Sequence, residues 1–208
     1  MNNGQRIQRA ANARGIACLV HFTPAVNAMS ILTHGLASRP TLDEAGIDYA
    51  YTDDWRGDGK MDAVCLSISQ IYLSMLASKR KVYNGEWVVF LLDASILWTH
   101  NCRFCWTNAA SREIRNHRGF LGGPWGFDEM FAPRPVSMID ATCRRTAYSL
   151  ADDVTTDNAA EVQVFDQIDS DLILGVGVQS EWHKTRMENM MLDIDRVRPV
   201  EVFDQIFK

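Results

Sequence analysis

Polar side chains of the types that enzymes use occur at three separated points of this 208-residue chain. His21 and Thr23 end a short apolar run, Arg56 lies in an acidic segment before a second run, and Glu161 opens a third. A carboxylate can act as a general base, and the rigid donor fork of an arginine suits phosphate. The start of a helix beside Thr23 and Ser30 would also attract anions. Taken alone, each residue is weak evidence, because a histidine at a strand end is more often a hydrogen-bonded structural residue and a glutamate on a strand more often faces solvent.

The apolar pattern predicts the elements that position these side chains. Residues 17–22 predict a buried strand, and Thr23 followed by Pro24 predicts the start of a helix that Gly35 ends. Residues 39–62 predict a polar, acidic loop. Further strands are expected at 63–69, 86–92, 159–165, 173–178 and 197–203, and helices at 71–80, 93–98 and 181–194. Because βαβ alternation, GxGxxG and GxxxxGK[ST] are absent, the sequence predicts an α+β domain and argues against Rossmann and P-loop nucleotide sites.

Residues 99–157 lack clear periodicity and contain many glycines, prolines and aromatic residues. A segment of this length without regular structure is usually functional or mobile. Its aromatic residues would either stack an unpaired base or fill the edge of the core. The segment also carries seven arginines, so the basic excess lies here and in the first 20 residues despite a net charge of −5. A solvated charged face and a weak phosphate-binding surface both remain open.

Composition indicates a soluble globular protein of one domain, with 47% hydrophobic and 23% charged residues. We expect no membrane segment and no secretory signal, and therefore a cytoplasmic location. Five cysteines form an odd set, and the CxxC at Cys102 and Cys105 lacks a second ligand pair, so no metal site is expected. Residues 162–168 and 200–206 nearly repeat, which fits two strands in similar surroundings or coincidence.

Taken in order, the motifs resemble the DarT-type DNA ADP-ribosyltransferases. The opening motif is His-Phe-Thr at 21–23, with Asn27, Ser-Ile-Leu at 30–32, Gly-Leu at 35–36 and Ser38. The arginine-bearing loop and its strand correspond to Arg-Gly-Asp-Gly at 56–59 and residues 63–69, with Met75 following. Asn-Ala-Ala-Ser at 108–111 and the glutamate-bearing strand at 156–162 complete the resemblance, which covers most of residues 18–178.

The resemblance implies a split β-sandwich fold and a toxin of a toxin–antitoxin or phage-defence system. Such an enzyme attaches ADP-ribose from NAD+ to a base in single-stranded DNA. It also implies an antitoxin that removes the modification, for example an ADP-ribosylglycohydrolase macrodomain. Within one domain, residues 1–16 would form a basic arm, 40–60 would cover NAD+, and 112–160 would recognise the substrate.

The resemblance also assigns site residues. Glu161 and Arg56 would be catalytic. NAD+ would be bound by His21, Phe22, Thr23, Asn27, Ser30, Gly35, Ser38, Ser67, Tyr72 and Met75. The nucleic acid would be bound by His117, Arg118, Trp125 and Arg144. Ser67 departs from the family, whose members often carry an aromatic residue on this strand.

The chemistry requires groups of these types. A carboxylate at Glu161 would stabilise the cationic sugar that forms as nicotinamide leaves, as carboxylates do in glycoside hydrolysis. Arginine has a pKa above about 12, so Arg56 is expected to act electrostatically. An unpaired base needs no extraction from a duplex stack, which favours a single-stranded acceptor. An RNA or protein acceptor and a catalytically inert nucleotide-binding module are the alternatives.

Overall fold

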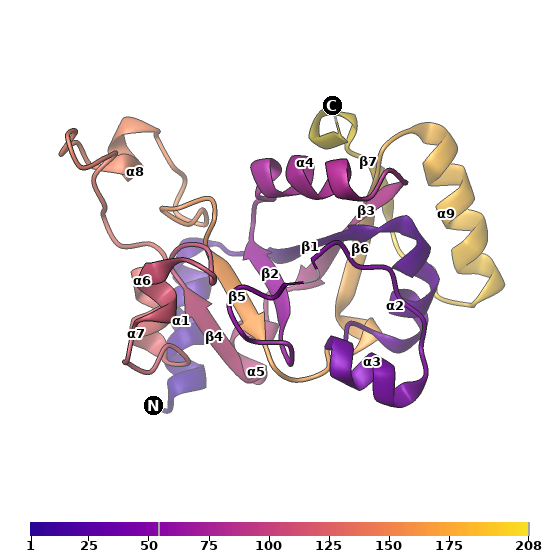
Figure 1. Cartoon of the computed structure of the whole chain (residues 1–208), viewed down its shortest axis with the longest axis horizontal. Helices are drawn as coiled ribbons and strands as arrows, with labels where there is room; N and C mark the ends of the chain where they lie inside the picture. Colours follow the sequence, from indigo (N-terminus) through magenta and orange to yellow (C-terminus); the bar gives the residue numbers. More distant parts are fainter. Residues whose placement is uncertain (54, 208) are drawn as a thin grey trace.

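The computed structural model describes residues 1–53 and 55–207, and its centre is a seven-stranded sheet (Figure 1). Neighbouring strands are antiparallel except β6 and β7, which are parallel and joined by helix α9 (Glu181–Asp193). The order across the sheet is β4 (Cys102–Cys105), β5 (Glu161–Val164), β2 (Val64–Ile68), β1 (Cys18–Pro24), β3 (Trp87–Asp93), β6 (Ile173–Val178) and β7 (Val200–Val202). The predicted α+β class is confirmed, with one βαβ unit at its C-terminal end.

The sheet is split between β1 and β2. Strand β1 pairs with β3 along its whole length, but its pairing with β2 consists of Leu19 with Ile68 and Val20 with Ser67. The other half of β2 pairs with β5. From His21 onward, β1 therefore separates from β2 and leaves a gap between two halves of the sheet.

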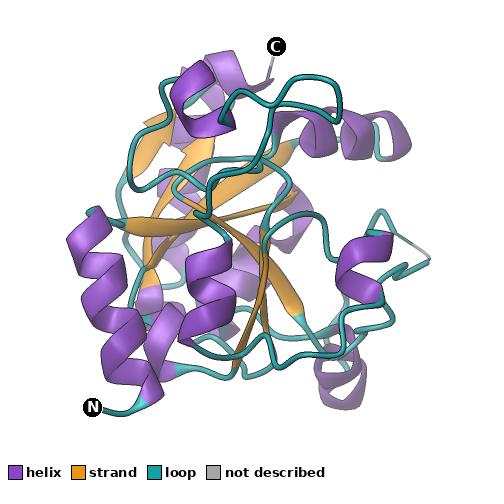
Figure 2. Cartoon of the chain, turned by 90° about the vertical axis from the view of Figure 1, so that its left-hand side faces the viewer, coloured by secondary structure: helices purple, strands orange, loops and turns teal. Residues whose placement is uncertain are grey.

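Alternate side chains of the strands pack into two apolar layers, with helices and loops around the strands (Figure 2). Phe90 and Leu92 of β3 face the larger core, and Trp87 and Val89 face the smaller one. The helices against the larger core are α1 (Asn3–Arg14), α2 (Ala28–His34), α5 (Ile96–Thr99), α7 (Pro124–Glu129) and α9. Helix α4 (Leu73–Val82) and the 3₁₀ turn η3 (Asp204–Phe207) cover the smaller core. The larger core links both ends of the chain.

The N-terminal segment differs from the basic arm expected for residues 1–16. It forms α1, which Asn2 and Gln5 start with a capping box. Ile7 and Ala11 are fully buried in the larger core. The apolar face of this helix consists of few residues, so the sequence shows no clear helical periodicity. Its arginines then suggest a basic arm.

The predicted start of the first internal helix was wrong. Thr23 and Pro24 both belong to β1, and the 3₁₀ turn η1 (Ala25–Asn27) precedes α2 without a side-chain cap. The predicted end is confirmed, because Gly35 follows α2 with a φ of 81°. A Cβ atom there would also lie 2.0 Å from the carbonyl oxygen of Ile168, so only glycine fits.

The two segments expected to be irregular contain further elements. Residues 39–62, expected to be a loop, begin with helix α3 (Arg39–Ala45), whose N-cap is Ser38. Asp54 of this loop lies outside the described residues. The second contains β4 and the short helices α6 (Arg112–Arg115), α7 and α8 (Arg144–Ala147). Helix α8 stands away from the body of the molecule (Figure 1). The 3₁₀ turn η2 (Ser170–Leu172) leads into β6.

The two near-repeats each start in a strand, but β5 lies inside the sheet and β7 at its edge, so their surroundings differ. No helix among the described residues has the length and apolarity needed to cross a bilayer.

Candidate active site

A cavity of about 430 Å³ opens where β1 separates from β2. Its wall comes from β1, α2, the segment between α2 and β2, β2 itself, α4 and the start of β5. Both predicted catalytic residues, Arg56 and Glu161, line it. So do all ten residues predicted to bind NAD+: His21, Phe22, Thr23, Asn27, Ser30, Gly35, Ser38, Ser67, Tyr72 and Met75.

His21 bridges the split in the sheet. Its Nδ1 lies 3.0 Å from the carbonyl oxygen of Cys65 on β2. A carbonyl oxygen only accepts, so Nδ1 carries the proton and Nε2 of the neutral ring is an acceptor. Burial lowers the pKa of His21, although the bond to Cys65 opposes this shift. The neutral ring can therefore accept a hydrogen bond from a hydroxyl group at neutral pH.

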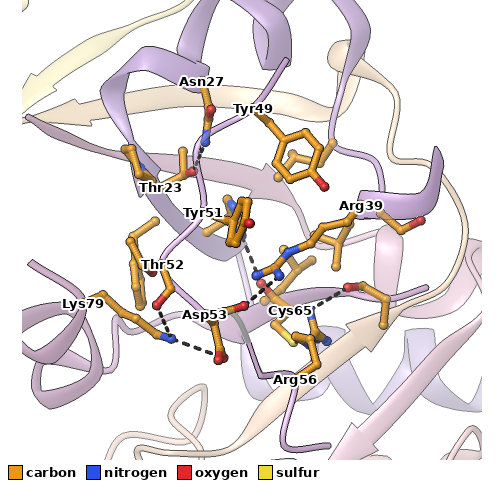
Figure 3. A pocket seen from close by; sticks show the side chains of 18 of the residues that line it. Thr23, Asn27, Arg39, Tyr49, Tyr51, Thr52, Asp53, Arg56, Cys65 and Lys79 are labelled. Atoms are coloured by element: carbon orange, nitrogen blue, oxygen red, sulfur yellow. Dashed lines mark hydrogen bonds and ion pairs between the residues drawn. The ribbon is translucent and has the colours of Figure 1, made fainter. Parts of the chain in front are cut away.

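Asn27 fastens the covering segment, residues 46–63, to β1. Its Nδ2 donates to Thr23 Oγ1 and to the carbonyl oxygen of Ala50, each at 2.8 Å. Its Oδ1 accepts from the backbone nitrogen of Ala50 at 2.7 Å. The amide of Asn27 is thus fully engaged within the protein, and its bonds to Ala50 hold this segment in place. Figure 3 shows its bond to Thr23.

Two cations hold the covering segment at a second point, around Asp53 (Figure 3). Arg39 Nη1 donates to the backbone oxygen of Asp53 at 2.7 Å, and its guanidinium lies 4.5 Å from the centre of the Tyr51 ring. Lys79 pairs with the Asp53 carboxylate at 3.2 Å and reaches the carbonyl oxygen of Thr52 at 3.4 Å. Both cations line the cavity, and sequence reasoning missed both.

Arg56 is held by a carboxylate from its own segment. Nε and Nη2 donate to the two oxygens of Asp58 at 3.1 and 2.9 Å, and Nη1 donates to the carbonyl oxygen of Ala63 at 3.2 Å. Burial alone would lower the pKa of Arg56, but the bonds to Asp58 and the nearby negative charges raise it above its ordinary value. Arg56 therefore stays protonated and acts as a fixed positive charge.

Glu161 lies in a largely buried part of the same cavity. Oε1 accepts from Asn108 Nδ2 at 2.8 Å, and Oε2 accepts from the backbone nitrogen of Ala109 at 3.2 Å. Burial raises the pKa of Glu161 to about 7, against the lowering effects of Ala109, Arg56 and Asn108. A carboxylate whose pKa lies near neutral pH can both bear a charge and accept a proton. Its partner Asn108 belongs to the Asn-Ala-Ala-Ser motif, which was the available signal for it.

The four residues expected to bind nucleic acid lie outside the cavity lining. His117 stacks on Trp125, with ring centres 5.4 Å apart and planes at 16°, and Trp106 meets both rings edge-on. Arg118 is exposed. Arg144 donates to the carbonyl oxygen of Val136 and pairs with Asp157, so it holds together the segment that carries α8.

The cysteine pair of the CxxC motif is buried in β4. Burial raises the pKa of both Cys102 and Cys105 to about 12, so both are neutral thiols. Within residues 1–53 and 55–207, no group of three or more histidine, cysteine, aspartate or glutamate side chains could hold a metal ion.

The comparisons with known proteins point to one family. The sequence model of the DarT family, described as single-stranded-DNA thymidine ADP-ribosyltransferase, matches residues 20–208. Among solved structures, Thermus sp. 2.9 DarT in complex with ADP-ribosylated single-stranded DNA has a TM-score of 0.64 at 12% identity, over 92% of this chain and 96% of that one. The same protein in complex with NAD+ has a TM-score of 0.60 at 12% identity, over 92% and 97%.

A third structure is Thermosipho africanus DarTG in complex with ADP-ribose, with a TM-score of 0.56 at 16% identity. The match covers 92% of this chain but 51% of that one, so the chain spans about half the length of this relative. These likenesses establish the shared fold. No curated protein sequence matches the chain.

Proposed function

The chain belongs to the DarT family of single-stranded-DNA thymidine ADP-ribosyltransferases, and on this premise we propose that it transfers ADP-ribose from NAD+ to a thymidine base in single-stranded DNA and releases nicotinamide. The observation that carries the proposal is the cavity at the split in the sheet. There a buried carboxylate, a fixed guanidinium and a neutral histidine converge from three distant parts of the chain.

Glu161 supplies the central chemistry. Cleavage of the bond between nicotinamide and ribose gives the sugar cationic character, and a carboxylate that binds the ribose 2′-hydroxyl is most effective at that point. Asn108 and Ala109 fix its two oxygens in advance, which reduces reorganisation during the reaction.

The acceptor base must also lose a proton. The ring nitrogen of thymine that is not bonded to deoxyribose carries a hydrogen. When this nitrogen forms a bond to the ribose carbon and the bond to nicotinamide breaks, that hydrogen leaves as a proton. Glu161 is the natural acceptor for that proton because its pKa is near 7. Arg56 keeps its own proton and stabilises the negative charge that develops on the base.

Arg39 is the cation best suited to the NAD+ pyrophosphate. Of the cations described in the cavity wall, Arg56 is paired with Asp58 and Lys79 with Asp53. Arg39 makes no ion pair with any described carboxylate and bonds instead to a backbone carbonyl and a ring face. Its remaining donors would bind phosphate oxygens, and the same side chain would then hold the covering segment over the dinucleotide.

The DNA strand would lie along α6. Arg112, Arg115 and Arg118 are exposed and have no ion-pair partner among the described residues. Helix α6 follows directly on Asn108 and Ala109, which hold Glu161, so phosphates bound there would bring a base to the mouth of the cavity. The half-exposed Trp125 would stack a neighbouring base.

We further propose that the protein is a toxin that acts in the cytoplasm, which suits its five free cysteines. Its neutralising partner would be an antitoxin with ADP-ribosylglycohydrolase activity of the macrodomain type. The DarTG relative, of which this chain spans about half, supports the presence of an antitoxin partner.

The test is an incubation of the purified chain with NAD+ and a thymidine-containing single strand, followed by mass spectrometry. We expect ADP-ribose on the strand, but none on the same strand without thymidine or on its duplex. Glu161→Gln should abolish transfer, whereas the exposed control Glu188→Gln should leave it unchanged. Labelling of RNA or protein alone would overturn the DNA acceptor, and full activity of Glu161→Gln would overturn the site.

A further inference from the structure

Arg56 and Glu161 share the cavity but do not form an ion pair with each other. Nε and Nη2 of Arg56 donate to Asp58, Nη2 also lies 3.4 Å from Cys65 Sγ, and the described ion pairs place no cation on Glu161. Among the described residues, the hydrogen-bond donors to the Glu161 carboxylate are the neutral groups of Asn108 and Ala109. Opposite charges that share a buried site would normally pair, because their attraction is strong where water is excluded.

Asp58 is itself held by a side chain of strand β5. Gln163 Nε2 donates a short hydrogen bond to Asp58 Oδ2, although 105 residues separate the two in the chain. Asp58 Oδ1 also accepts from the backbone nitrogen of Lys60 at 3.2 Å. The Asp58 side chain is 6% exposed, so it cannot easily turn toward water. Burial alone would raise the pKa of Asp58, but the bonds from Arg56 and its other donors hold it low, so the group remains charged.

Gln163 is positioned for this contact by its place on β5. It lies two residues after Glu161, so both side chains project from the same face of the strand. It is fully buried, and its Oε1 accepts from Arg103 Nη1 at 2.8 Å. That bond fixes which end of the amide faces Asp58. Arg103 in turn donates to the carbonyl oxygen of Ile114 in α6.

We propose that Asp58 and Gln163 are positioning residues that hold Arg56 beside Glu161 and prevent the two from pairing. The proposal rests on the function proposed above. Asp58 supplies the negative charge that occupies the guanidinium, and Gln163 fixes Asp58 relative to the strand that carries Glu161. The carboxylate of Glu161 therefore stays free for the ribose and for the proton of the acceptor.

The arrangement sets the charge state of Glu161. The groups that face it are Arg56 and Asp58 from the covering segment, Cys65 on β2, Cys105 on β4, and the donors of Asn108 and Ala109. Without the charge of Asp58, Arg56 would be released toward Glu161, and the pKa of Glu161 would fall. An opposite charge within a few ångströms lowers a carboxyl pKa by about 1–3 units.

The test compares the full-length chain with Asp58→Asn over pH 5–9, using NAD+ and a thymidine-containing single strand. We expect kcat to fall about 10²-fold, as a misplaced group can cause. We also expect the acidic limb of the kcat profile to move about one unit or more to lower pH. The control Asp62→Asn changes an exposed carboxylate of the same segment and should behave as wild type.

Asp58→Glu and Gln163→Glu keep the measurement informative if Asp58→Asn folds poorly. Asp58→Glu retains the charge, so its acidic limb should return to the wild-type position even if kcat recovers only in part. Gln163→Glu retains an acceptor for Arg103 but removes the donor to Asp58, and should lower kcat. A folded Asp58→Asn protein with an unshifted limb and unchanged kcat would overturn the proposal. Absence of transfer by wild type would instead overturn the proposed function.

Discussion

Replacing Glu161 by glutamine should make the protein more stable at alkaline pH while it removes transfer. The folded protein binds a proton at Glu161 up to pH about 7, whereas the unfolded chain releases it near the ordinary value of 4.5. Between these values the native state holds more protons than the unfolded state, so stability falls as pH rises through this window and stays lower above it. A glutamine does not titrate and avoids this loss.

The size of the effect follows from the shift. A displacement from 4.5 to about 7 corresponds to about 3 kcal/mol of destabilisation above pH 7. Glutamine keeps one of the two hydrogen bonds from Asn108 and Ala109 but not both, which costs about 1 kcal/mol. The net gain of about 2 kcal/mol should raise Tm by about 4–8 °C for a chain of this length.

Thermal unfolding of wild type, Glu161→Gln and Glu188→Gln at pH 5 and pH 8.5 would measure this effect. We expect the Glu161→Gln protein to match wild type or unfold slightly earlier at pH 5, and to unfold several degrees later at pH 8.5. The Glu188→Gln control should follow wild type at both values, because its carboxylate is exposed. A Tm difference between Glu161→Gln and wild type that does not change with pH would show that burial does not raise the pKa of Glu161.

Three further predictions concern the cofactor, the DNA strand and the N-terminal helix. Arg39→Gln should raise KM for NAD+ about tenfold with little change in kcat. Calorimetry should show weaker binding of ADP-ribose, which carries the pyrophosphate, but unchanged binding of adenosine. An equal loss of affinity for both ligands would contradict a phosphate contact. The double change Arg112→Gln and Arg115→Gln should weaken the binding of single-stranded DNA. The slope of log K against log salt concentration should become shallower by about 0.7 for each phosphate that the variant no longer binds. An unchanged slope in a salt titration would mean that the DNA does not lie along α6. Ile7→Ala should cost about 2–5 kcal/mol in chemical denaturation, and the exposed control Arg9→Ala close to nothing, because α1 is part of the core; equal stability of both variants would mean that the segment is a dispensable arm.

The sheet was largely predictable because its central strands are apolar runs. Strands β1 and β3 contribute to both cores, and β2 and β6 bury most of their apolar side chains in the larger one, so composition alone marks these strands. Strand β4 is only four residues long and lies among turns, which leaves no periodicity to detect. Helix α1 buries only Ile7 and Ala11, so its single apolar edge does not distinguish it from a polar arm.

The candidate site was predictable where local motifs carry it. His21, Arg56 and Glu161 lie in recognisable strings, and the structure brings all three to one cavity. The residues that hold them were not predictable, because their contacts depend on the tertiary fold. Gln163 meets Asp58 across 105 residues, and no local pattern encodes that contact.

Arg144 shows how a predicted binding residue can also have a structural role. The resemblance assigns Arg144 to the nucleic acid, and in the structure its guanidinium contacts Val136 and Asp157. An arginine in a long connection has many backbone carbonyls within reach, so it often stabilises the connection itself. Basic composition therefore indicates the surface, and only the fold identifies which arginines remain free.

We propose that Glu161 enables this cavity to move ADP-ribose from NAD+ to a thymidine base. The most direct test is the mass of a single strand containing one thymidine, after incubation with NAD+ and either wild type or Glu161→Gln. We predict a single ADP-ribose adduct on the thymidine with wild type and none with the variant. An adduct of equal yield with both proteins would remove Glu161 from the reaction, and no adduct while NAD+ is consumed would exclude thymidine as the acceptor.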